Sequence, residues 1–336
     1  MRWKGSSTAL CEKNIKKPPL LILTGPTSVG KSALSIALAK EVDGEIISAD
    51  SMQVYRYMDI GSAKITGEQM QGVSHHMIDI LDPSESFNIN LFQKRAKEYI
   101  REIYDRGHIP ILVGGTGFYI QSVLYDIDFT EESEPQTYRS ELERLAEQKG
   151  PEYLHEMLAS RDPESAQTIH PNNVKRVIRA LEYYQSTGDK ISAHNRSERE
   201  KEAAYNACYF VLNDDRAKIY ERIDRRVDQM MGQGLVEEVK HLQSMGMTRD
   251  MVSMQGLGYK EILAYLEGEI SLERAVYLIK RDTRHFAKRQ LTWFRRERDV
   301  IWVNKQEFDY QEDRILDHMI RNMRERGMIA GESEAK

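Results

Sequence analysis

The chain has 336 residues and a net charge of −5, with 40% hydrophobic and 30% charged residues. This composition is ordinary for a globular protein of one or two domains. The mild acidity excludes a protein that coats nucleic acid indiscriminately, although it leaves room for a local nucleic-acid site. No apolar run approaches the length of a membrane span. The two cysteines, Cys11 and Cys208, form neither a C-x-x-C pair nor a metal cluster. We therefore predict a cytoplasmic protein with free thiols and no membrane contact.

The first residues are polar and basic without an apolar core, so we expect an N-terminal extension and no signal peptide. Five short runs beyond it are nearly continuous in apolar residues, as is typical of parallel strands buried on both faces. They are Leu20–Thr24, Glu45–Ala49, Ile109–Val113, Tyr209–Leu212 and Val300–Val303. Helical patterns lie between them, including Ser32–Lys40 and Leu91–Tyr104. This alternation predicts an α/β fold, a parallel sheet flanked by helices.

The segment between the third and fourth runs differs from the rest. It is rich in charge and lacks strand-like runs, and its apolar residues recur with helical spacing at Val174, Val177, Ile178, Leu181 and Tyr184. We interpret it as a helical insertion domain. The predicted parts are an extension (1–17), the first part of the core (18–128), the insertion (129–204), the second part of the core with C-terminal helices (205–325) and a polar tail (326–336).

The first predicted strand runs into "GPTSVGKS", which satisfies the phosphate-loop pattern G-x-x-x-x-G-K-[ST] between a strand and a helix. The backbone amides and the helix N-terminus favour phosphate oxygens, and the lysine adds a mobile positive charge. We therefore predict a P-loop NTPase-like core that holds a diphosphate or longer group, with Mg²⁺ on the Ser32 hydroxyl. The loop does not identify what carries the phosphates, and an ATP-dependent kinase is the default interpretation. The expected phosphate ligands are Gly25, Thr27, Ser28, Val29, Gly30, Lys31 and Ser32.

Two other strand ends meet the same edge of the predicted sheet, where ligands bind in open α/β folds. Asp50 follows the second strand directly, and its position is compatible with a Mg²⁺ ligand, a general base or a helix cap. The third strand ends in "GGTG", whose glycines permit close backbone approach and whose Thr116 offers a hydroxyl. His75 and His76 lack a third ligand at suitable spacing, so surface or packing roles are favoured over a metal site.

The segment 274–298 is locally basic, with nine Lys or Arg residues against two acidic ones, a net charge of 9 − 2 = +7. Phe286, Trp293 and Phe294 are interleaved with the positive charges. Such a mixture suits phosphate contact with base stacking, and it equally suits a solvated helix whose aromatic residues face the core.

Together these stretches resemble the tRNA dimethylallyltransferase family, also called tRNA isopentenyltransferases. The matching segments, in the family's order, are "GPTSVGKS", "ADSMQVYRYMDIGSAK", "HHMIDI", "GGTGFYI", "VKRVIRALE", "GLGYKE" and "RHFAKRQLTWFR". Two positions depart from the family's commonest residues, Ser32 in place of threonine and Lys260 in place of arginine, and both keep the chemical character. The resemblance implies a loop that holds dimethylallyl diphosphate, with Mg²⁺ as cofactor. The acceptor would be N6 of the adenosine 3′ of the anticodon (tRNA position 37), with diphosphate released.

The resemblance also implies roles for individual residues. Asp50 would be the general base, Thr116 would hold the amine or the diphosphate, and Arg226 is preferred over Arg222 as the diphosphate ligand. The insertion would grip the anticodon stem-loop of the tRNA. The expected tRNA contacts are Asp50, Ser51, Met52, Gln53, Thr116, Arg139, Lys175, Arg176, Arg179, Lys260, Arg289 and Arg295. We expect a monomer.

Two alternatives remain open at this point. A P-loop kinase acting on a small molecule or nucleotide would share the fold and the Mg²⁺ site. A non-catalytic RNA-binding protein would have a vestigial loop, and the intact Lys31, Ser32 and Asp50 argue against it.

Overall fold

The computed structural model describes residues 17–129 and 136–330. The predicted N-terminal extension up to residue 16, with Cys11, and the end of the polar tail from residue 331 lie outside the described residues. Within the described part, Cys208 is buried and unbridged. In the same part, no helix is both long enough and apolar enough to cross a membrane.

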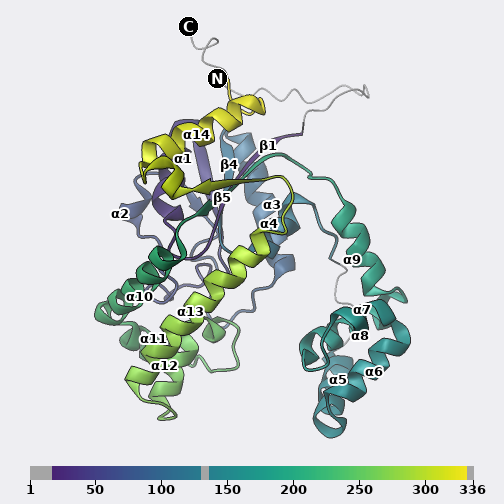
Figure 1. Ribbon diagram of the computed structural model, residues 1–336. Coiled ribbons are helices and arrows are strands. Elements are labelled where there is room, and N and C mark those ends of the chain that lie inside the picture. Colours follow the sequence, from purple (N-terminus) through teal and green to yellow (C-terminus); the bar gives the residue numbers. More distant parts are fainter. Residues whose placement is uncertain (1–16, 130–135, 331–336) are drawn as a thin grey trace. The chain divides into compact units, whose positions relative to one another are not determined.

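The core is a six-stranded sheet in the order β3-β2-β4-β1-β5-β6, with every neighbouring pair parallel (Figure 1). The five predicted strands and the α/β fold class are confirmed. One strand, β3, was not expected, because a two-residue strand leaves no periodic signal. The strands are β1 (Pro19–Thr24), β2 (Gly44–Ala49), β3 (His75–His76), β4 (Ile109–Gly114), β5 (Asn206–Asn213) and β6 (Val300–Asn304).

Helices cover the sheet on both sides (Figure 1). On one face, α1 (Lys31–Val42) and α14 (Glu312–Glu325) bury Leu38 and Met319 against strand residues such as Leu21 and Phe210. On the other, α3 (Ile89–Asp105) packs against β2 and β4 and contacts α4 (Gly117–Leu124). Both helices predicted by periodicity, Ser32–Lys40 and Leu91–Tyr104, are confirmed as parts of α1 and α3.

A helical group follows β5. It consists of α10 (Arg216–Gln233), α11 (Leu235–Ser244), α12 (Tyr259–Leu266) and the long α13 (Leu272–Phe294), with the short turn η1 (Ser253–Gln255) before α12. Helix α13 packs against α10, α12 and α4, so it joins this group to the core. Two further short elements complete the core, α2 (Gly67–Met70) and η2 (Lys305–Phe308).

Residues Tyr125–Ala203 form a second compact unit. Its helices are α5 (Gln136–Lys149), α6 (Pro151–Arg161), α7 (Pro163–Thr168), α8 (Val174–Thr187) and α9 (Ile191–Glu200). The helical spacing noted in the sequence belongs to α8, whose Val177, Ile178 and Leu181 are buried against Leu142, Leu154 and Leu158. This unit therefore has a hydrophobic core of its own.

Because the strands of the core are parallel, their carboxyl ends lie at one edge of the sheet. The residues that follow β1, β2, β4, β5 and β6 at this edge include Gly25, Asp50, Gly115, Asp214 and Lys305. The fold thus gathers segments that are distant in sequence around the phosphate loop.

Candidate active site

The phosphate loop connects β1 to α1 and has a conformation that glycine makes possible. Gly25 has φ +146°, and a Cβ there would lie 2.2 Å from the carbonyl oxygen of Leu212. Gly30 has φ +102°, and Ser28 also adopts a positive φ of 62°. The Ser28 hydroxyl is buried and has no hydrogen-bond partner within the described chain. A buried hydroxyl of this kind is expected to be paired, so the loop retains bonding capacity for a ligand.

Lys31 is the first residue of α1, and its side chain folds back over the loop. Nζ donates hydrogen bonds to the carbonyl oxygens of Gly25 (3.0 Å) and Pro26 (2.9 Å). Burial, together with the nearby Arg226, lowers the pKa of Lys31 to about 8, and Asp50 partly opposes this shift. An anion placed between Lys31 and Arg226 would stabilise the charged forms of both side chains and so offset their burial and their mutual repulsion.

Asp50 closes a turn and also interacts electrostatically with two cations. Its Oδ1 accepts hydrogen bonds from the backbone amides of Met52 (2.8 Å) and Gln53 (3.4 Å), which closes the turn after β2. This is a turn and not the helix cap that position alone suggested, because the next helix along the chain, α2, begins well beyond it. The same carboxylate is electrostatically coupled to both Lys31 and Arg226. The structure thus brings together the phosphate loop, Asp50 and Arg226, which come from β1–α1, β2 and α10.

The two candidate arginines of α10 differ in their partners. Arg222 donates from Nε to the carbonyl oxygen of Ser28 (2.9 Å) and forms an ion pair with the buried Asp214 (2.6 Å). Arg222 therefore links the phosphate loop to Asp214 at the end of β5. Arg226 is half-buried and forms no hydrogen bond with the described residues, and burial lowers its pKa. Arg226 is the one of the two with donors available to a ligand.

Glu238 of α11 holds residues 59–61 of the loop that follows Asp50. The Glu238 carboxylate accepts hydrogen bonds from the amides of Asp59 (2.9 Å), Ile60 (2.7 Å) and Gly61 (3.0 Å), and from the hydroxyl of Tyr259 (2.8 Å). A carboxylate bonded to three amides holds a loop tightly.

Of the predicted tRNA contacts, Ser51, Met52 and Gln53 directly follow Asp50, and Lys260 lies on α12. Ser51, Met52 and Gln53 are all half-buried, and Oε1 of Gln53 accepts from the hydroxyl of Ser48 (2.9 Å). Met52 packs against Gly256, where a Cβ would lie 2.7 Å from its sulfur. Lys260, two residues beyond Gly258, lies 3.6 Å from the Glu261 carboxylate. The segment "GLGYKE" therefore supports the segment "DSMQ".

The "GGTG" loop after β4 is packed against α13. A Cβ on Gly115 would lie 2.1 Å from Nε2 of Gln290, and one on Gly117 would lie 2.2 Å from the indole of Trp293. These glycines therefore permit the approach of side chains from α13. Thr116 is half-buried at the start of α4, and its carbonyl oxygen accepts from the amides of Tyr119 and Ile120. Its hydroxyl makes no hydrogen bond within the described chain.

The basic segment of α13 divides into two halves. Lys280, Arg281 and Arg284 form ion pairs with Asp228, Asp282 and Asp224. Further along, four exposed cations have no acidic partner within the described chain: Lys288, Arg289, Arg295 and Arg296. Of the interleaved aromatic residues, Phe294 is fully buried in the core and Trp293 is half-buried. The net charge of the segment is thus concentrated at its C-terminal end.

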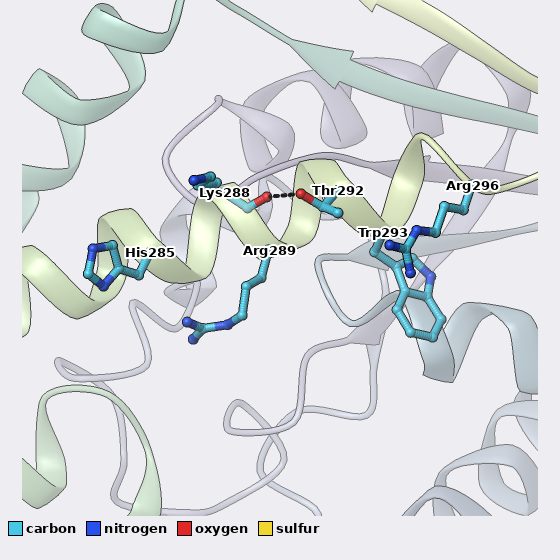
Figure 2. Close-up of a pocket in the computed structure, with 6 residues that line it drawn as sticks. All are labelled: His285, Lys288, Arg289, Thr292, Trp293 and Arg296. Atoms are coloured by element: carbon cyan, nitrogen blue, oxygen red, sulfur yellow. Dashed lines mark hydrogen bonds between the residues drawn. The ribbon is translucent and has the colours of Figure 1, made fainter. Parts of the chain in front are cut away.

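An open pocket of 380 Å³ lies along the C-terminal part of α13. Figure 2 shows Arg289 and Trp293 extending from the same side of the helix. The pocket is lined by His285, Lys288, Arg289, Thr292, Trp293 and Arg296. Cations beside an indole can hold the phosphates and bases of a single-stranded nucleic acid.

The predicted contacts in the helical unit have different environments. Lys175 and Arg176 are exposed in the first turn of α8, and Arg179 is half-buried one turn on. Arg139 of α5 forms a two-fold ion pair with Glu182 of α8, with both N···O distances 2.7 Å. Arg139 therefore joins two helices of its own unit.

The two histidines of β3 take part in packing. Nε2 of His76 lies 2.7 Å from the Glu45 carboxylate, which also binds Arg106, and the His76 ring lies against Tyr99. Nδ1 of His75 is 2.9 Å from the carbonyl oxygen of Val73. These contacts support the packing interpretation.

The oxygen donors at the loop fit a magnesium ion that is held largely by its substrate. Ser32 is exposed at the start of α1, and the Asp50 carboxylate is close enough to Lys31 to act on it electrostatically. Among the described residues, no three His, Cys, Asp or Glu side chains are close enough to form a metal site by themselves. Mg²⁺ commonly takes one or two protein ligands and completes its shell with substrate phosphates and water.

The fold and this site define an α/β protein of the P-loop class. Its phosphate loop lies near the Asp50 carboxylate at the end of β2. Within that class, the chain belongs to the IPP transferase family, whose family model matches residues 53–297. Over 312 residues it is 60% identical to a tRNA dimethylallyltransferase of Lachnoclostridium phytofermentans, covering 93% of this chain and 99% of that protein.

Solved structures agree with this assignment. The chain is similar to the full-length tRNA isopentenylpyrophosphate transferase of Bacillus halodurans, with 45% identity and a TM-score of 0.70, covering 93% of this chain and 98% of the other. It is also similar to a eukaryotic dimethylallyltransferase acting on tRNA, with 31% identity and a TM-score of 0.74, covering 85% and 74% of the two chains.

Three residues around the site were not predicted from the sequence. Gln290 links the two glycine-rich loops, Glu238 fixes the loop after Asp50, and Lys305 lies beside Gly30. Gln290 is 6% exposed, and a polar residue on the buried side of a predicted amphipathic helix was the available signal for it. Glu238 and Lys305 gave no signal, because their partners are remote in sequence.

Proposed function

We propose that the protein transfers a dimethylallyl group from dimethylallyl diphosphate to N6 of the adenosine 3′ of the tRNA anticodon, position 37. The observation that carries this proposal is the meeting of Lys31, Arg226 and Asp50 at one edge of the sheet. Two cations there can hold a diphosphate leaving group while a carboxylate faces the acceptor. The identity to a tRNA dimethylallyltransferase over most of the chain supports the same reaction.

On the donor side, the protein stabilises charge on the leaving group. The C–O bond between the dimethylallyl carbon and the diphosphate breaks, and both electrons of that bond stay on the diphosphate. The loop amides, the Lys31 ammonium and the Arg226 guanidinium would neutralise this developing charge. A bound Mg²⁺, held by Ser32 and the diphosphate, would add further charge neutralisation.

On the acceptor side, Asp50 removes a proton. The adenine amine is a weak nucleophile because its lone pair is delocalised into the ring. As the new bond from N6 to the dimethylallyl carbon forms, one N6 proton passes to the Asp50 carboxylate, so charge does not build up on nitrogen. Thr116, whose hydroxyl is uncommitted, is the candidate to orient the amine.

The tRNA is bound by basic surfaces on both units. On the core, the unpaired cations at the end of α13, including Arg289 and Arg295, are the candidates for phosphate contacts, with Trp293 beside them for a base. In the helical unit, Lys175 and Arg176 are exposed at the N-terminus of α8, where the helix dipole also favours phosphate. Arg139 is already paired with Glu182, and we assign it a supporting role.

The kinase alternative is disfavoured by family membership, since the chain belongs to the IPP transferases and its relatives act on tRNA by name. A direct test measures diphosphate release from dimethylallyl diphosphate, with and without tRNA, in the presence of Mg²⁺. We expect release only when tRNA is present. ADP formation from ATP, without any release of diphosphate from the prenyl donor, would contradict the proposal.

A further inference from the structure

We propose that Lys305 is a third cationic ligand of the donor diphosphate, beside Lys31 and Arg226. This inference rests on the proposed function, because it assumes that a diphosphate occupies the loop. It assigns a role to a residue at the end of β6 that lies outside the phosphate-loop motif.

The position of Lys305 is defined by its distance from the loop. A Cβ built on Gly30 would lie 3.3 Å from Nζ of Lys305, so the ammonium is next to the backbone of the last loop glycine. In a phosphate loop the amides around this glycine point at phosphate oxygens. An ammonium beside them can reach the same oxygens as a point charge.

The backbone of Lys305 is held in place by the strand pairing before it and the turn after it. Asn304 pairs with Asn213 in the register of β5 and β6, and their side chains are joined by a hydrogen bond of 3.0 Å. The carbonyl oxygen of Lys305 then accepts from the amide of Tyr310 (3.1 Å). The Cα position from which the Lys305 side chain extends is therefore fixed.

Lys305 has no neutralising partner within the described chain, and the acids nearest to it in sequence are engaged elsewhere. Glu307 accepts from Nδ2 of Asn304 (2.8 Å), and Asp309 pairs with Arg314. The buried Asp214 at the adjacent strand end is paired with Arg222 and Tyr310. A half-buried ammonium that lies over a phosphate loop without an acidic partner is available to an anion.

The side from which Lys305 approaches separates its role from that of the acceptor groups. Strands β4, β1 and β5 lie between β6 and β2, the strand that leads to Asp50. Lys305 therefore holds the diphosphate from the side of the sheet remote from the proton acceptor. Its loss should weaken donor binding and leave the proton transfer step unchanged.

The test compares Lys305→Ala with Lys305→Arg and with Lys94→Ala, which removes one exposed charge from α3. Calorimetric titration with inorganic diphosphate and Mg²⁺ measures affinity directly. One charge-assisted contact corresponds to about tenfold in affinity. We expect Lys305→Ala to bind diphosphate about tenfold more weakly, with KM for dimethylallyl diphosphate raised by a similar factor. Lys305→Arg should retain most of the affinity, and Lys94→Ala should match the wild type.

A kinetic readout separates this role from general damage. At saturating donor, kcat and KM for tRNA should be the same for Lys305→Ala and the wild type, as should the melting temperature. Equal diphosphate affinity in the wild type and Lys305→Ala would overturn the role of Lys305 alone. Failure of the wild type to bind diphosphate at all would instead overturn the proposed function on which the inference rests.

Discussion

The backbone amide of Thr27 in the phosphate loop donates a 2.9 Å hydrogen bond to Oε1 of Gln290 on α13, 263 residues later in the chain. Nε2 of the same side chain donates to the carbonyl oxygen of Gly115 (3.0 Å). One buried amide thus joins the two glycine-rich loops to the helix that carries the unpaired cations. The phosphate loop and the pocket-bearing end of α13 share this connection.

Replacing Gln290 should disturb the site and the fold together. Gln290→Ala leaves the Thr27 amide and the Gly115 carbonyl, both of partly buried residues, without this partner, which costs about 1–3 kcal/mol for each group that water cannot reach. We expect a lower free energy of unfolding in urea and a rise in KM for the donor. Thr292→Ala, an exposed change on the same helix, is the control and should behave as the wild type. Wild-type stability in Gln290→Ala would show that the link is dispensable.

Lys31 should be required for transfer yet costly to the fold. Its folded pKa of about 8 is below the ordinary value of 10.5, so the folded state disfavours the charged form. Below pH 8 both states are protonated and this cost is present in full. Between about pH 8 and 10.5 the unfolded state binds more protons, so stability rises with pH. Lys31→Met, which keeps most of the length of the side chain and removes its charge, removes this dependence.

The measurement is urea unfolding of the wild type and Lys31→Met at pH 7 and pH 10. We expect the variant to be relatively more stable at pH 7 than at pH 10, to have lost transfer activity and to bind tRNA as the wild type does. In the wild type, diphosphate affinity should fall as pH rises above about 8, as the ammonium loses its proton. A constant stability difference between the two pH values would contradict the assigned shift.

The division of α13 into paired and unpaired cations predicts which charges bind RNA. Arg289→Ala and Arg295→Ala should weaken tRNA binding. Each should also reduce the slope of log affinity against log salt concentration by about one unit, because each removes one protein cation that contacts an RNA phosphate. Lys280→Ala is the matched control, because Lys280 is paired with Asp228. Filter binding across a salt series distinguishes them. Equal effects of Lys280 and Arg289 replacements would remove the basis for the division.

Asp50 offers a direct test of the acceptor chemistry, because two replacements separate its roles. Asp50→Asn can still accept hydrogen bonds from the amides of Met52 and Gln53, but it cannot take a proton. Asp50→Ala loses both functions. Since a general base contributes about 10²–10⁴-fold, single-turnover transfer by Asp50→Asn should fall by that order.

The melting temperature of Asp50→Asn should change little, whereas Asp50→Ala should also lose about 1 kcal/mol of stability with the turn. Recovery of the Asp50→Asn rate at high Mg²⁺ would identify Asp50 as a metal ligand. A near-normal rate in the folded variant at ordinary Mg²⁺ would remove it from the mechanism.

The sequence predicted most of the sheet because buried parallel strands leave continuous apolar runs, and it predicted the loop because phosphate binding imposes fixed glycine and lysine positions. It did not predict which cations are neutralised. Lys280 and Lys288 look alike in the sequence, and only the packing of α10 on α13 places Asp228 beside the former. The glycines of "GGTG" were ambiguous for the same reason, since Gln290 and Trp293 approach them from a distant segment.

The most direct test of the central proposal is mass analysis of tRNA nucleosides after incubation of unmodified tRNA with the protein, dimethylallyl diphosphate and Mg²⁺. We predict one new nucleoside, an adenosine heavier by one dimethylallyl group, that maps to the position 3′ of the anticodon and is nearly absent with Asp50→Asn. Unchanged nucleosides in the presence of folded wild-type protein, or a prenyl group at another position, would contradict the account.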